Sequence, residues 1–173
     1  MMWQLIELSL LAAGAVHAYV TPGRSPARFA EMMLVYFLAG YCGATMFAVG
    51  VVAVVNPDWV AVNMAQVPPG NAVMIWAGFF FLGVSLISML TIWLRGVFLI
   101  APVLTWSIYW AGATYAHLVA DEKNGHAITS DVVLDTFFSH GMVAVILLAL
   151  SGLLWRSSSA PQRAASFNIE PSS

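Results

Sequence analysis

The sequence predicts an all-α integral membrane protein built as a single bundle of five transmembrane helices. Hydrophobic residues make up 61% of the 173 residues and charged residues only 8%, against roughly 45–50% and 25% in soluble domains. The apolar runs are continuous and lack the period-two alternation of a transmembrane β-barrel. Helices are therefore expected, because backbone polar groups in lipid must be satisfied within their own segment.

Five apolar stretches have the length of roughly 20 residues that a helix needs to cross a bilayer core about 30 Å thick. They cover residues 3–20, 32–55, 72–94, 97–118 and 132–155. Helix-breaking residues separate them: Pro22 and Gly23, Asn56 and Pro57, Pro68 to Gly70, and Asn124 and Gly125. The shortest break, Arg95 and Gly96, predicts a very tight turn between the third and fourth helices. We expect a transmembrane domain over residues 1–156 and a disordered cytoplasmic tail, rich in Ser, Ala and Pro, over 157–173.

The distribution of basic residues predicts the orientation. With the N-terminus outside, the inner segments hold all the arginines and the outer ones only Lys123, as the positive-inside rule requires. The first helix ends in small residues like those of a signal-peptide cleavage site, but no basic residue precedes it and Glu7 interrupts it. We expect it to remain uncleaved, which leaves the C-terminus in the cytoplasm.

Small residues in the second stretch lie four apart, Ala39 with Gly43 and Gly40 with Ala44. This spacing lets helices approach closely in lipid, either within the bundle or between copies in a homo-oligomer or membrane complex. The bilayer is the main expected partner. With a net charge of −2 and no basic run, the sequence predicts no basic surface for binding nucleic acid. The single cysteine, Cys42, excludes cysteine-rich metal motifs.

Ionisable residues inside the spans are the candidate functional residues, because a charge at mid-membrane costs roughly 2.5–3.5 kcal/mol. Glu7, Asp135 and His140 qualify. Asp135 and His140, five residues apart, diverge by roughly 140° on a helix and cannot pair there. Glu7 is the carboxylate whose expected depth is nearest to that of His140.

The fourth helix adds a polar stripe of Thr114, His117 and Asp121, spaced by three and four residues. A carboxylate one turn from an imidazole can orient a proton carrier or a metal ligand, or can form an ordinary hydrogen bond at a helix end. His126 in the following loop is a further possible ligand. Two axial histidines could instead hold haem; His117 and His140 share the outer half, although upright helices would separate their depths by roughly 10 Å. His17 lies at the inner end of the first helix.

These residues predict a hydrated, acidic and histidine-containing outer pocket that binds or transports a proton or a metal cation. The predicted metal ligands are His117, His140, Glu7 and Asp121, and no catalytic residue is assigned. Two alternatives stay open: a membrane anchor or quinone- or haem-associated subunit of an oxidoreductase, and a structural subunit without a site.

The segments "WLRGVFLIAP" and "WAGATYAHL" resemble the central region of an uncharacterised group of small bacterial multi-pass membrane proteins. The matching positions are Arg95, Gly96, Gly112, Ala113 and His117. The chain is similar, more distantly, to the four-helix DoxX-like proteins, some of which are associated with quinol oxidation, and it departs from them by its extra helix. The resemblance covers two helices, implies a bacterial inner membrane and brings no known activity.

Overall fold

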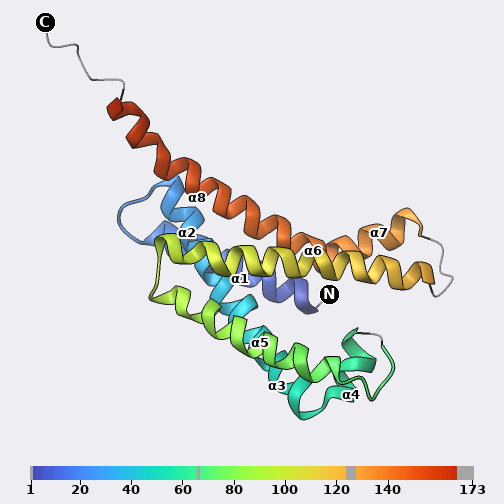
Figure 1. Ribbon diagram of the computed structural model, residues 1–173. Coiled ribbons are helices and arrows are strands. Elements are labelled where there is room, and N and C mark those ends of the chain that lie inside the picture. The colour runs from blue at the N-terminus through green and yellow to red at the C-terminus, as the bar shows by residue number, and fades with distance from the viewer. Residues whose placement is uncertain (1, 66, 124–127, 167–173) are drawn as a thin grey trace, which may run out of the picture. The chain divides into compact units, whose positions relative to one another are not determined.

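The computed structural model describes residues 2–65, 67–123 and 128–166, and this part of the chain contains helices and connections but no strand. In chain order the α-helices are α1 (Met2–Val20), α2 (Pro26–Tyr36), α3 (Met46–Val55), α4 (Pro57–Val60), α5 (Val73–Met89), α6 (Ile100–Lys123), α7 (Ser130–Thr136) and α8 (Met142–Ser166). These helices are continued or joined by shorter segments (Figure 1). Three are π-helical, η1 (Phe37–Thr45), η2 (Ala61–Ala65) and η5 (Phe137–Gly141), and two are 3₁₀ helices, η3 (Leu90–Ile92) and η4 (Gly96–Leu99).

Five helical stretches are long and apolar enough to cross a membrane, which confirms the predicted number of spans. They are Trp3–Val20, Pro26–Val55, Val73–Ile92, Gly96–Lys123 and Ser130–Ser157. The chain is therefore all-helical and has the features of a multi-pass membrane protein. The helix breaks predicted at Pro22 and at Asn56 are present. α1 ends two residues before Pro22. The Asn56 side chain caps α4 by accepting a hydrogen bond from the Trp59 N–H.

Polarity is distributed as expected for a protein in lipid. Ser85, Ser88 and Thr91 are fully buried, whereas Trp76 and Phe79 are 79% and 61% exposed. The buried Ser85 hydroxyl donates to the carbonyl of Cys42 at 3.0 Å. Since lipid tails are as apolar as the outer side chains, close packing and interhelical hydrogen bonds hold such helices together.

The described chain divides into two compact units. Unit 1 comprises Met1–Leu10 and Val35–Trp106, and unit 2 comprises Leu11–Leu34 and Ser107–Ser173. In unit 1, α3 and α5 pack closely enough to exclude side chains at their contact: a Cβ on Gly78 would lie 3.1 Å from the Gly50 carbonyl and 2.8 Å from Val54 Cγ2. Gly43 likewise faces Met89. Both glycines thus have a packing role inside the unit.

Trp106 forms the aromatic centre of unit 1. It is fully buried and stacks on Phe81 with ring centroids 6.1 Å apart and planes within 5°. Its indole N–H donates to the Ser88 hydroxyl at 2.7 Å, as a buried indole requires. A tight turn precedes α6 and confirms the prediction at this break: Arg95 is extended and Gly96 has φ of 65°, a value that favours glycine.

In unit 2, η5 joins α7 to α8 as one continuous span (Figure 1). α8 is helical as far as Ser166, so its helix extends past the start of the predicted tail at residue 157. Residues 167–173, with the rest of that prediction, lie outside the described residues, and so do Asn124 and Gly125.

Candidate functional site

Two histidine side chains from different helices are in contact within unit 2. His117 belongs to α6 and His140 to η5. Their ring centroids are 4.5 Å apart, with the ring planes tilted by 31°. Both side chains are half-buried. The two imidazoles therefore form a single site, here called the histidine pair.

The pair forms although the sequence predicts a depth difference of roughly 10 Å for upright helices. Both helices are longer than predicted: α6 continues to Lys123 rather than ending at Leu118, and α7 begins at Ser130 rather than at Val132. Six residues of helix, about 9 Å, thus follow His117 before α6 ends. His117 thus lies six residues before the end of its helix, rather than one residue before the predicted end at Leu118.

A wide helical turn sets the direction of His140. The N–H of Met142 donates to the carbonyl of Phe137, five residues earlier, which is the spacing of a π-helix. The wider turn rotates the residues after it relative to α7. The direction of His140 therefore differs from that given by the 100° period of an α-helix, and such turns occur often at functional sites.

Gly141 allows η5 to approach α6. A Cβ on this residue would lie 2.7 Å from Phe137 Cδ2 and 3.3 Å from Thr114 Oγ1. The Thr114 hydroxyl is turned back to the carbonyl of Trp110, at 2.8 Å. A side chain at position 141 would therefore crowd Phe137 and Thr114, beside the imidazole that contacts His117.

Ser139 fixes the protonation pattern of the His140 ring. Its Oγ lies 2.7 Å from the carbonyl oxygen of Asp135 and 2.8 Å from His140 Nδ1. A carbonyl can only accept, so the hydroxyl hydrogen points to Asp135, and the second contact then needs a donor at Nδ1. With its hydrogen on Nδ1, the neutral ring presents the lone pair of Nε2 for a cation.

An indole ring covers one side of the pair. The ring centroid of Trp110 is 5.7 Å from that of His140, at an interplanar angle of 43°, and the side chain is only 7% exposed. The contact with Trp110 was not identified from the sequence, because it joins two helices.

The structure places the other predicted site residues as follows. Asp121 follows His117 by four residues on α6, so it lies on the same helical face. Asp135 is exposed at the start of the fifth span, and the exposed His17 lies in the last turn of α1. His126 lies outside the described residues. Glu7 belongs to unit 1 and the histidines to unit 2, so the predicted convergence of Glu7 on His140 stays a prediction.

The number of side chains available as ligands bears on which cation this site could bind. Over residues 2–65, 67–123 and 128–166, no group of three or more His, Cys, Asp or Glu side chains is arranged to hold a metal ion. Zinc sites in proteins use three or four side-chain ligands, and the histidine pair supplies two. The metal-binding prediction for His117, His140, Glu7 and Asp121 therefore stays a prediction.

The ring separation is also short for haem. A metal–imidazole bond is about 2 Å long, so axial rings on opposite faces of a haem iron have centroids roughly 6 Å apart, with the porphyrin between them. The observed 4.5 Å between the His117 and His140 rings leaves no room for that arrangement without separating the helices.

Unit 1 contains a second candidate, the carboxyl group of Glu7. The side chain is 1% exposed, and neither oxygen has a partner at full hydrogen-bond geometry. The Tyr41 side chain interacts with it as a hydrogen-bonding group. α1 and η1 meet closely near this residue, since a Cβ on Gly40 of η1 would lie 2.5 Å from Leu10 Cδ2 of α1. A buried carboxylate with so few partners needs a proton or a cation to offset its charge.

No protein-family model, no curated protein and no solved structure matches this chain. The resemblance to small bacterial multi-pass proteins and to DoxX-like proteins therefore stays a prediction.

Proposed function

We propose that the chain is a multi-pass membrane protein whose histidine pair binds one proton and acts in proton transport or sensing at the outer side of the membrane. The observation that carries this proposal is the 4.5 Å separation of the His117 and His140 rings on two different helices. Imidazole is the side chain whose charge changes between about pH 5 and pH 8.

Two imidazoles at this distance act as one acceptor. Two positive charges about 4 Å apart repel by roughly 4 kcal/mol at an effective dielectric constant near 20. Once one ring carries a proton, a second proton on the other ring meets that repulsion. The pair is therefore suited to hold a single proton.

A proton also suits the donor set better than a metal ion does. The Ser139 hydroxyl leaves only Nε2 of His140 open, and His117 adds one further ring. A proton needs only one nitrogen, whereas a metal would need more ligands from water or from parts of the chain outside the described residues.

Nitrogen NMR on histidine-labelled protein in lipid nanodiscs tests the proposal. The neutral His140 ring should show its hydrogen on Nδ1, and its titration should shift in His117→Gln because the coupled ring is gone. The control is His17→Gln, which removes an exposed histidine from α1 and should leave the His140 titration unchanged. An unchanged titration in His117→Gln would reject the pair as a unit.

Two further measurements on the same samples test the alternatives. Zinc binding measured by calorimetry that disappears in His140→Ala would favour the metal version of the site. A Soret band in protein expressed with haem available, and lost in the same variant, would favour the oxidoreductase subunit. We expect neither signal.

A further inference from the structure

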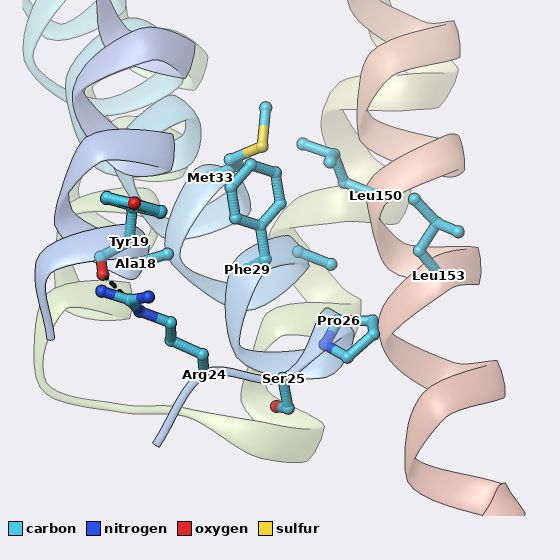
Figure 2. Close-up of a pocket in the computed structure, with 10 residues that line it drawn as sticks. Ala18, Tyr19, Arg24, Ser25, Pro26, Phe29, Met33, Leu150 and Leu153 are labelled. Carbon is cyan, nitrogen blue, oxygen red and sulfur yellow. Dashed lines mark hydrogen bonds between the residues drawn. The ribbon is translucent and has the colours of Figure 1, made fainter. Parts of the chain in front are cut away.

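Unit 2 contains a groove of about 610 Å³ between the end of α1, the start of α2 and α8 (Figure 2). Its volume is within the range of ligand pockets. It is lined by Ala18, Tyr19, Arg24, Ser25, Pro26, Phe29, Ala30, Met33, Leu150 and Leu153. Figure 2 shows Phe29 and Met33 of α2 opposite the two leucines of α8, with Arg24 at the other end of the set.

The groove has one polar end and one apolar end. The polar end lies in the connection between α1 and α2, where Arg24 and Ser25 are the hydrogen-bonding side chains. The apolar end runs into the membrane spans: Met33 is seven residues after the start of the second span at Pro26, or about 10 Å along the helix. Leu150 is seven residues before the end of the fifth span at Ser157, at a similar depth.

Arg24 is oriented with most of its donors available. Its Nε donates to the Tyr19 carbonyl at 2.9 Å, and its guanidinium carbon lies 4.3 Å above the centre of the Tyr19 ring. Among the described residues it has no ion pair and no other hydrogen bond. The four hydrogens of its two terminal nitrogens can therefore bind an anion, in the fork geometry that suits phosphate.

The backbone turn and α2 add to the positive character of this end. Gly23 has φ of 83°, which lets the chain reverse so that Arg24 folds back over Tyr19. The carbonyl and the hydroxyl of Ser25 accept hydrogen bonds from the N–H groups of Phe29 and Arg28, at 3.0 Å and 3.2 Å. The N-terminal end of α2 thus lies beside Arg24, where a helix favours negative charge.

We propose that this groove binds one phospholipid with an anionic headgroup. The phosphate lies against Arg24, and an acyl chain runs along Phe29, Met33 and Leu150 into the bilayer. Charge complementarity at the polar end and the apolar lining that begins at the end of the first span both match this amphiphile. Basic pockets between helices at the membrane surface recognise anionic lipid headgroups in this way. The inference is independent of the histidine pair.

Native mass spectrometry of the delipidated full chain, with added phosphatidylglycerol or phosphatidylcholine, tests the lipid site. We expect the wild type to retain one phosphatidylglycerol in preference to phosphatidylcholine. Arg24→Gln should weaken that binding roughly tenfold, since a charge-assisted pair is lost. The matched control is Arg95→Gln, which removes an exposed arginine from the turn before α6 and should bind like the wild type.

Leu153→Trp provides a second variant, which fills the groove and leaves its charge unchanged. Reduced binding of both lipids in this variant, with normal helicity, would support an acyl chain in the groove. Equal binding of the two lipids by the wild type, or unchanged phosphatidylglycerol binding in Arg24→Gln, would overturn the proposal. Inorganic phosphate that displaces the lipid at millimolar concentration would also overturn it, because the site would then bind free phosphate.

Discussion

At the scale of single residues, the Ser139 hydroxyl is the side-chain group that contacts Nδ1 of His140. Its hydroxyl gives its hydrogen to the Asp135 carbonyl and accepts from Nδ1. In Ser139→Ala this acceptor is lost, and we expect the neutral His140 ring to populate both tautomers. Nitrogen chemical shifts measure the two populations. A ring that stays entirely in the Nδ1–H form in Ser139→Ala would show that another group fixes it.

Glu7 makes a different prediction, because it is buried without full hydrogen bonds. Glu7→Leu removes two poorly satisfied oxygens and should raise thermal stability in detergent, by roughly 1–3 kcal/mol. The control is Glu122→Leu, at an exposed position of α6, where we expect little change. A fall in the unfolding temperature of Glu7→Leu would mean that the carboxyl group stabilises unit 1.

Residue types and spacing predicted the ionisable candidates but not their partners. The cost of charge in lipid identifies Glu7 and His140 from the sequence alone. The contact of His140 with His117 depends on the lengths of two helices and on the absence of a side chain at Gly141. Such contacts arise from packing between segments far apart in the chain, on which the local sequence gives no direct information.

At the scale of helices, some glycines are covered by a neighbouring helix and others are not. A Cβ on Gly78 would be 3.1 Å from both Ala53 Cβ and the Gly50 carbonyl. A Cβ on Gly83, on the same helix, would meet no atom of a neighbouring described element within 4 Å. Gly78→Leu should therefore destabilise unit 1 by roughly 1–3 kcal/mol or more. Gly83→Leu is the matched control and should be tolerated. Equal loss of stability in the two variants would contradict the close contact of α3 with α5.

Helix positions were predictable because apolar length and breaking residues act locally, at positions such as Pro22, Asn56 and Gly96. The π turns in η1 and η5 were not, since a hydrophobic pattern without a clear period gives no sign of an extra residue. In η1 the Thr45 hydroxyl donates to the Gly40 carbonyl at 3.1 Å, five residues earlier, and so helps to satisfy a carbonyl of the widened turn. Threonine and serine near glycine are a signal worth testing for such turns.

At the scale of the whole molecule, the five spans and the positions of the arginines predict the orientation. Reporter fusions after Arg28, Arg95 and Arg156 should all lie in the cytoplasm, and a fusion near Asn124 should lie outside. Finding the reporters at Arg28 and Asn124 on the same side would contradict the five-span arrangement. With the predicted result, the histidine pair would lie toward the outside and the lipid groove toward the cytoplasm.

Counting protons tests the histidine pair most directly. Purified protein in detergent is titrated from about pH 8 to about pH 5, and the proton uptake per chain is compared among variants. The uptake by carboxyl groups is common to all variants, so it cancels in this comparison. If the pair holds a single proton, His117→Gln and His140→Gln each take up as many protons as the wild type. The double variant then takes up one fewer. Loss of one proton in each single variant and of two in the double variant would mean that the histidines titrate independently, which contradicts the proposal.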